Sequence, residues 1–132
     1  MKPEELVPDL DLCKRLKELG LCKDTKFFWY RDVTAATDCW RASYWLACHS
    51  MPGRIPAPTA AELADKLPWR ILKGGKEYSY GINPIPNGDG VIEFEISYDD
   101  GDEVYGPVIL DASLANALAR MLIWLAEKGA LK

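Results

Sequence analysis

Residues 91–110, VIEFEISYDDGDEVYGPVIL, decide the fold class of this chain. Apolar and acidic side chains alternate in the first part of the stretch, which is typical of a strand with one face on a core and one in water. Asp100-Gly101 is a strong two-residue hairpin signal, so residues 103–110 are expected to return antiparallel beside the first strand. Pro107 lacks an amide hydrogen and predicts that the second strand lies at a sheet edge or carries a bulge. The side chains expected to point inward are Ile92, Phe94, Ile96 and Tyr98.

Helices with defined ends lie on both sides of this hairpin in the sequence. The last helix is expected between a cap at Asp111 or Ser113 and a stop at Gly129. Its apolar stripe consists of Leu114, Leu118, Met121, Leu122 and Leu125. The first helix ends at Gly20, which supplies the left-handed conformation of a helix stop. Its cap is Asp9 or Asp11, and its stripe is Leu12, Leu16 and Leu19.

A third helix is expected in the middle of the chain. Prolines make residues 55–58 extended, because they fix the backbone and disfavour helix just before them. Thr59 and Glu62 then have the spacing of a capping box. This helix is expected to end near Leu67, since Pro68 follows.

Two further strand pairs complete the predicted sheet. Residues 26–32 and 39–48 are expected to form an antiparallel pair, and Gly74-Gly75 joins residues 69–73 to residues 76–82. The sequence therefore predicts an α+β fold of two layers. In this fold three helices cover one face of an antiparallel sheet of about five to six strands, in the order α-ββ(β)-α-ββββ-α.

The size and composition predict one domain. The chain has 132 residues, of which 48% are apolar and 27% charged, so it can bury one full core. We therefore expect a single α+β domain over residues 1–132. No apolar run reaches the roughly eighteen residues that a membrane-spanning helix needs, and the amino-terminal segment is acidic rather than basic. These features favour a cytoplasmic protein without a membrane partner.

Acidic residues dominate one part of the chain. Residues 77–119 contain nine carboxylates and neither Lys nor Arg, although the whole chain has a net charge of only −4. Proteins that bind nucleic acid usually present a cationic patch to the phosphates, so direct nucleic-acid binding is not expected. The acidic candidates for an interaction surface are Glu93 and Glu95 on the outward strand face and Asp99, Asp100, Asp102 and Glu103 at the hairpin tip. The tip lacks the ligand frame of an EF-hand, so no calcium site is predicted.

The cysteines and the single histidine do not form a recognisable reactive set. Cys13, Cys22, Cys39 and Cys48 lack the close pairs that structural zinc sites use. Without an export signal disulfides are disfavoured, so we expect the thiols to pack as small apolar groups. His49 follows Cys48 on a predicted strand and therefore points to the opposite face. The sequence predicts no catalytic residue, metal site or cofactor.

The tryptophans are too many for the predicted strands to bury. Trp45 is opposite in phase to Trp40 and lies on the side of Arg41, so Trp45 and Arg41 join the candidate interaction surface. Packing of Trp45 against a helix or long loop is the alternative. A pocket around Trp29, Trp45 and Trp69 would instead suit a small ligand.

Four segments resemble parts of small uncharacterised proteins encoded by bacteriophages and prophages. They are DLCKRLKELG (11–20), KFFWYRD (26–32), PAPTAAELADKLP (56–68) and ARMLIWLAEKG (119–129). The resemblance covers most of the chain but brings no assigned activity. It implies a phage gene product that acts in the cytoplasm of a bacterial host. Those proteins tend to have a Pro-Gln-like turn where this chain has Cys22-Lys23, which argues against Cys22 as a metal ligand.

These observations favour a non-enzymatic accessory protein. We expect it to bind a host or phage protein through an acidic or aromatic surface, because carboxylates steer a cationic partner. Two alternatives stay open at this point. One is a small ligand-binding domain or enzyme with an aromatic pocket, and the other is a homo-oligomer whose exposed aromatic side chains meet.

Overall fold

The computed structural model describes residues 2–32, 39–44 and 53–131. The helices are α1 (Pro3–Leu6), α2 (Leu10–Glu18), α4 (Ala60–Lys66) and α5 (Leu114–Glu127). The strands are β1 (Phe27–Asp32), β2 (Cys39–Tyr44), β3 (Ile55–Ala57), β4 (Arg70–Lys73), β5 (Lys76–Pro86), β6 (Ile92–Asp99) and β7 (Val104–Asp111).

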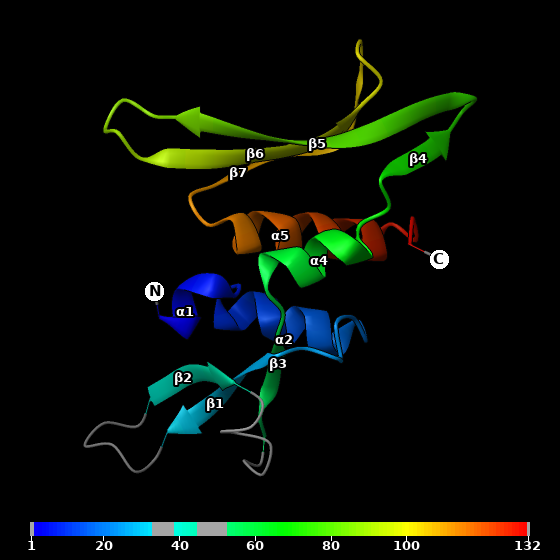
Figure 1. Cartoon of the computed structure of the whole chain (residues 1–132). Coiled ribbons are helices and arrows are strands. Elements are labelled where there is room, and N and C mark those ends of the chain that lie inside the picture. Colours follow the sequence, from blue (N-terminus) through cyan, green and yellow to red (C-terminus); the bar gives the residue numbers. More distant parts are fainter. Residues whose placement is uncertain (1, 33–38, 45–52, 132) are drawn as a thin grey trace.

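The strands form two antiparallel sheets, and the helices lie between them (Figure 1). The three-stranded sheet has the order β2-β1-β3, and the four-stranded sheet has the order β4-β5-β6-β7. Helix α5, with α4 beside it, lies against the four-stranded sheet, and α2 and α1 lie between α5 and the three-stranded sheet. The predicted α+β class and antiparallel pairing are confirmed.

The predicted single sheet of five to six strands with helices on one face is wrong. The described part of the chain has seven strands in two sheets, and four helices instead of three. Alternation along a strand shows which side chains share a face, but it does not show which strands pair. The three-stranded sheet packs on α2, whereas helix α5 is covered by the four-stranded sheet, α4 and α2. The buried residues of α5 are Ala115, Asn116, Ala117, Leu118, Ala119, Met121, Leu122, Ile123 and Leu125.

Helix α1 is the element that changes the predicted order, since it adds a helical turn before α2. One turn is too short to show a helical period in the sequence. Pro3 begins it, and the Lys2 amide donates to the Glu5 carboxylate at 3.1 Å. The carboxylate of Glu4 accepts from the backbone amide of Ala42 at 3.4 Å, so α1 closes the edge of β2.

The helix ends were predicted more accurately than the sheets. The Thr59 hydroxyl accepts from the Glu62 amide at 3.3 Å, and the Glu62 carboxylate accepts from the Thr59 amide at 3.0 Å, as in a capping box. Ser113 caps α5 through the Asn116 amide. Gly20 and Gly129 have φ angles of +73° and +71°, and both follow a helix end as expected.

The four-stranded sheet contains the bulge that Pro107 predicted. Ile96 pairs with Ile109 and Tyr98 with Tyr105, so residues 106–108 of β7 face a single residue of β6. Strand β7 is also an edge strand, which Pro107 tolerates because its missing amide hydrogen faces no partner strand. Ile96 and Tyr98 are buried as predicted, whereas Ile92 is 52% exposed. Ile92 is the first residue of β6, and the hairpin of β5 and β6 extends past the helices at that end (Figure 1).

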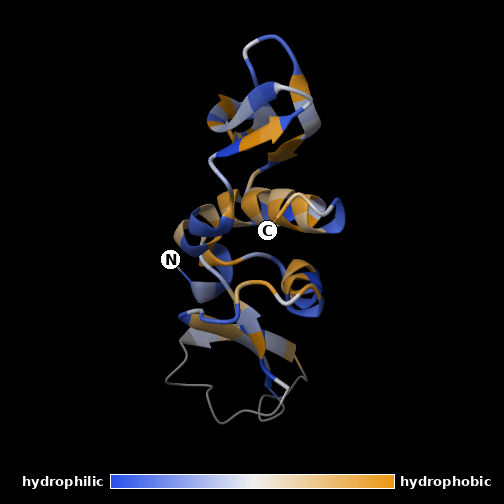
Figure 2. Ribbon diagram, turned by 90° about the vertical axis from the view of Figure 1, so that its right-hand side faces the viewer, coloured by the Kyte–Doolittle hydropathy of each residue, from blue (hydrophilic) through white to orange (hydrophobic). Residues whose placement is uncertain are grey.

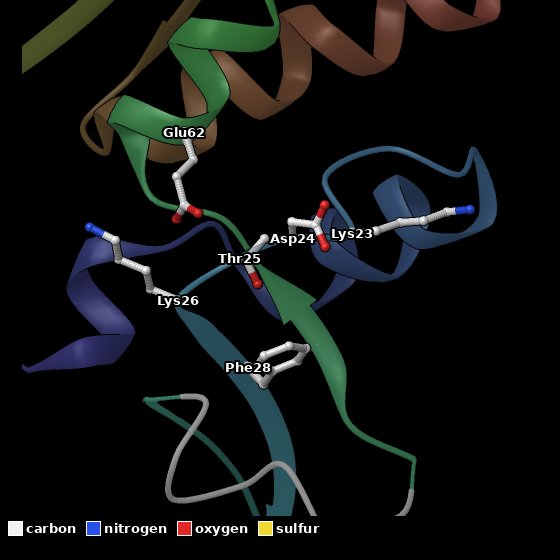
Figure 3. Close-up of a pocket in the computed structure, with 6 residues that line it drawn as sticks. All are labelled: Lys23, Asp24, Thr25, Lys26, Phe28 and Glu62. Atoms are coloured by element: carbon white, nitrogen blue, oxygen red, sulfur yellow. The ribbon is translucent and has the colours of Figure 1, made fainter.

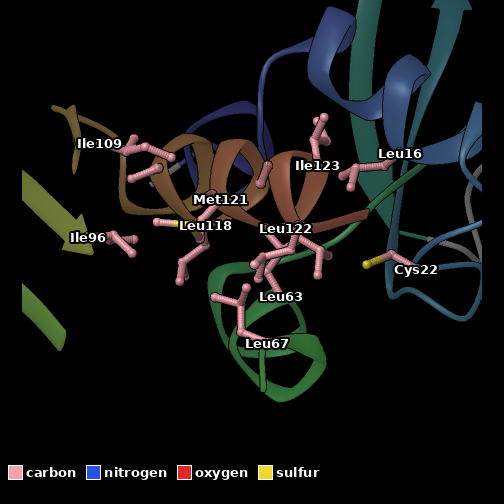
Figure 4. Packing of buried hydrophobic residues seen from close by; sticks show 14 of the residues in the cluster. Leu16, Cys22, Leu63, Leu67, Ile96, Ile109, Leu118, Met121, Leu122 and Ile123 are labelled. Carbon is pink, nitrogen blue, oxygen red and sulfur yellow. The ribbon is translucent and has the colours of Figure 1, made fainter. Parts of the chain in front are cut away.

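Two hydrophobic cores lie on opposite sides of the helical layers. The first core joins α5 to α4, α2 and the four-stranded sheet, and Figure 4 shows Leu63 and Leu67 of α4 beside Met121 and Leu122 of α5. The second core lies between α2 and the three-stranded sheet. It consists of Val7, Cys13, Phe27, Trp29, Ala42, Ile55 and Ala57. The hydrophobic colour of the middle layer in Figure 2 follows this arrangement, with α5 apolar along much of its length.

Candidate functional site

The face of the four-stranded sheet that points away from the helices carries three of the predicted interaction residues, Glu93, Glu95 and Asp99, and the tip residues Asp100, Asp102 and Glu103 lie beside it. The opposite face of the same sheet is the inner face, and its side chains Tyr78, Ile96, Tyr98 and Ile109 are buried. Because side chains alternate along each strand, their sequence neighbours point outward. We define the outer face by these residues: Arg70, Leu72, Glu77, Ser79, Ile85, Glu93, Glu95, Asp99, Val104, Val108 and Leu110.

Glu93 and Glu95 lie in the middle of the outer face, as the alternation predicted. Both are half-buried on β6. Glu93 is opposite Ile85 of β5, and Glu95 is opposite Leu110 of β7, so each carboxylate has an aliphatic neighbour across the strands. The Asn87 side-chain amide donates to Glu93 at 3.3 Å. Within residues 2–32, 39–44 and 53–131, no Lys or Arg forms an ion pair with either glutamate.

The carboxylates at the hairpin tip have structural partners of their own. One carboxylate oxygen of Asp100 accepts from the amides of Asp102 and Glu103 at 2.9 and 2.7 Å. These backbone donors, led by the Glu103 amide, lower the pKa of the Asp100 carboxyl. Asp99 likewise accepts from the Gly101 amide at 3.1 Å, and Glu103 forms an ion pair with Lys76 at 2.9 Å. The tip residues therefore hold the turn in shape beside the outer face.

Arg41 does not join this surface in the structure. Arg41 lies on β2 of the three-stranded sheet, beyond the helical layers, and its Nε is 3.1 Å from the Asp32 carboxylate. It lines a cavity of about 590 Å³ together with Lys2, Glu4 and Tyr30. Trp45 lies outside the described residues, as do Cys48 and His49. The predicted surface is thus divided between two sheets, and its acidic part alone stays together.

Exposed aliphatic side chains are the part of the outer face that the sequence analysis missed. Leu72 is 71% exposed, Val108 50%, Val104 49%, Leu110 47% and Ile85 37%. A signal for three of them was present, because alternation in β7 places Val104, Val108 and Leu110 on the side opposite the buried Ile109. In the register these aliphatic side chains alternate with carboxylates, because Leu72 lies opposite Glu77, Ile85 opposite Glu93, Val104 opposite Asp99 and Leu110 opposite Glu95.

The aromatic pocket considered in the sequence analysis is not formed by Trp29 and Trp69. Trp29 belongs to the second core, where it is 9% exposed and its Nε1 donates to the Pro8 carbonyl at 3.1 Å. Trp69 precedes β4 in the other sheet and is 64% exposed, with the Arg70 guanidinium 4.8 Å from its ring centre. The two indoles therefore lie in different parts of the molecule.

The buried thiols have the chemistry of packing groups. Burial raises the pKa of the Cys13 thiol to about 12 and that of the Cys22 thiol to about 11. A protonated thiol is a poor nucleophile and a poor metal ligand. Among the described residues, no group of three or more His, Cys, Asp or Glu side chains is arranged to hold a metal ion.

Comparisons with known proteins add no further constraint on the site. In the described part of the chain, no helix combines the length and apolar character needed to cross a membrane. No protein-family model, curated protein or solved structure matches this chain.

Proposed function

We propose that this chain is a non-enzymatic binding protein that docks a partner protein on the outer face of its four-stranded sheet. The observation that carries the proposal is the combination of exposed aliphatic side chains with two glutamates that lack a cationic partner in the described residues. Burial of the aliphatic side chains would supply the free energy of binding. The glutamates would select a partner with Lys or Arg beside its own apolar surface and would speed its approach.

The setting of this proposal is the phage one that the sequence resemblance implies. The chain would act as an accessory protein in the cytoplasm of a bacterial host, and its partner would be a host or phage protein. Nucleic acid is a poor fit to the outer face, because phosphates and carboxylates repel each other. A cationic protein surface fits the same carboxylates well.

A homo-oligomer is the competing proposal, since exposed aliphatic surface can also bury itself against a second copy. Two copies that met through the outer face would bring Glu93 and Glu95 close to the same carboxylates of the other copy. Arg70 is the one Lys or Arg among the residues that define the outer face, and it already forms an ion pair with Glu77 at 3.3 Å. A different partner that supplies the cations is therefore the better fit.

Affinity capture from a bacterial lysate tests the proposal with two variants of the outer face. Glu93→Gln with Glu95→Gln removes two charges, and Val108→Ser with Leu110→Ser removes apolar area. We expect each pair to weaken capture of the same protein by at least about tenfold, measured as a dissociation constant with the purified partner. The charge effect should shrink at high salt, since salt screens exposed charges.

The matched control changes the same number of charges elsewhere. Asp11→Asn with Asp65→Asn neutralises two exposed carboxylates on α2 and α4 and should leave binding at the wild-type level. Capture of a protein that neither outer-face pair reduces would overturn the proposal. Light scattering that shows a dimer lost in the Val108→Ser, Leu110→Ser protein would replace it with the homo-oligomer.

A further inference from the structure

A cavity beside the three-stranded sheet concentrates positive charge in this acidic protein. It has a volume of about 420 Å³ and lies between the end of α2, the segment that leads into β1, and the start of β3. The residues that line it are Lys17, Lys23, Phe28, Gly53, Arg54 and Pro56. Three of these described residues are cations and none is a carboxylate, although the whole chain has a net charge of −4.

Arg54 is the half-buried cation among these residues. Its Nε is buried, and no hydrogen-bond acceptor lies within reach of it; no other buried side-chain nitrogen or oxygen of the described residues is left in this state. A buried donor without an acceptor costs free energy, so native proteins usually pair such a group with protein, water or a bound molecule. The Arg54 guanidinium also lies 5.3 Å from the centre of the Phe28 ring, which holds the donor in place beside the cavity.

Lys23 connects this cavity to a second one that has carboxylates of its own. The second cavity is lined by Lys23, Asp24, Thr25, Lys26, Phe28 and Glu62. In Figure 3 Lys26 and Glu62 point toward each other across it, whereas Lys23 points away from both. The Glu62 carboxylate is already used as a cap, since it accepts from the amide and the hydroxyl of Thr59, each at 3.0 Å. Lys23 is thus left to contribute its charge to the cavity of Arg54.

We propose that the cavity of Lys17, Lys23 and Arg54 binds the phosphate group of a small phosphorylated molecule. A phosphate dianion matches three cations better than a carboxylate does, and a guanidinium donates to phosphate oxygens through a planar fork. Phe28 and Pro56 provide apolar surface next to the cations, which suits an organic group attached to the phosphate. This site lies on the other sheet from the outer face and is independent of the proposed protein partner.

Calorimetric titration with two probes tests the proposal and separates the sources of the phosphate. Phenyl phosphate carries both the phosphate charge and an attached organic group, and inorganic phosphate carries the charge alone. We expect the wild-type protein to bind phenyl phosphate at least about fivefold more tightly than inorganic phosphate. Equal affinity for the two would keep the anion site but overturn the organic part of the proposal. No binding of phenyl phosphate at about 10 mM would overturn the site altogether, because a weaker affinity has no use in a cell.

Variants of the cavity decide where the probe binds. Lys23→Gln changes an exposed side chain and should fold normally, and we expect it to weaken phenyl phosphate binding by at least about tenfold. Arg54→Lys keeps the charge but lacks the planar pair of guanidinium donors. We expect it to weaken phenyl phosphate binding by a similar factor. Lys128→Gln removes one exposed charge at the end of α5 and serves as the control. Binding that survives the first two changes, or that Lys128→Gln reduces as much, would contradict the proposed location.

Discussion

Gly106 has a φ of +82°, and a Cβ at this position would lie 2.6 Å from Cη2 of Trp124. The bulge of β7 therefore packs its bare backbone flat against the indole of α5. Trp124 also meets Tyr105 edge to face, with ring centres 5.6 Å apart. The contact explains why Trp124, at the margin of the apolar stripe of α5, is partly buried inside the molecule.

We predict that Gly106→Ala lowers the free energy of unfolding by at least about 2 kcal/mol, because the change adds backbone strain and a clash with a rigid ring. Thermal or denaturant unfolding measures the effect. Gly81→Ala is the matched control, since Gly81 lies on neighbouring β5 and a Cβ there would meet nothing within 4 Å. Equal stability of the two variants would show that the indole does not pack on Gly106.

The buried thiols predict how stability changes at alkaline pH. The pKa values of Cys13 and Cys22 are raised by burial from 9.0 to about 12 and about 11. At pH values between the unfolded pKa of 9.0 and the raised folded pKa, the unfolded chain loses thiol protons that the folded chain keeps. The free energy of unfolding therefore falls as the pH rises through this range. Each thiol contributes at most about 1.4 kcal/mol per pH unit to the decline.

Chemical denaturation at a series of pH values from 8 to about 11 checks this prediction. The Cys13→Ala, Cys22→Ala double variant should lose stability less steeply than the wild type over this range. The same slope in both proteins would mean that the buried thiols ionise as easily as free ones.

At the scale of elements, one polar contact joins the two ends of the chain. The Asn116 side chain on α5 accepts from the Asp9 amide at 2.8 Å and donates to the Asp9 carboxylate at 3.1 Å. Asp9 precedes α2, and its side chain makes no cap on that helix. It is used instead to fix the start of α2 against the start of α5, and Asn116 is 8% exposed at the contact.

We predict that Asn116→Leu costs about 1–3 kcal/mol of stability, since it leaves the amide and the carboxylate of Asp9 without partners. Asn116→Asp has nearly the same shape but places a second carboxylate against Asp9. The loss of stability of this variant relative to the wild type should be largest at neutral pH. It should shrink as the pH falls through about 4, where a protonated carboxyl can donate a hydrogen bond again. Thermal unfolding at both pH values measures this, and a deficit independent of pH would contradict the contact.

Helix ends and the two faces of each strand could be predicted from the sequence because both depend on residues close together along the chain. Thr59 with Glu62, Gly20 and Gly129 marked helix ends correctly, and alternation placed Glu93 and Glu95 outward. The single turn of α1 was not predictable, because its role depends on a contact between Glu4 and the distant Ala42. The pairing of Arg41's strand with β1 was predicted correctly, but that this pair forms a sheet apart from the other four strands was not.

At the scale of the whole molecule, the division into two sheets is the feature that sequence patterns did not contain. Each of the two sheets has an apolar face, and either would satisfy a helix packed against it. The breadth of the buried surface on α5 was visible as a run of apolar and small residues over 114–125, interrupted only by Asn116 and Arg120. Such a helix needs cover on opposite sides, and here a sheet covers one side and the helices α2 and α4 cover the other.

The same stacking of layers gives the molecule two separate poles. The outer face of the four-stranded sheet is acidic, and the cavity of Lys17, Lys23 and Arg54 adjoins the three-stranded sheet, with the helical layers between them. A partner seated on the first pole leaves the second open to solvent. Under the two proposals, one copy of the chain would have a valency of two for unlike ligands. It would hold a protein at one end and a small phosphorylated molecule at the other.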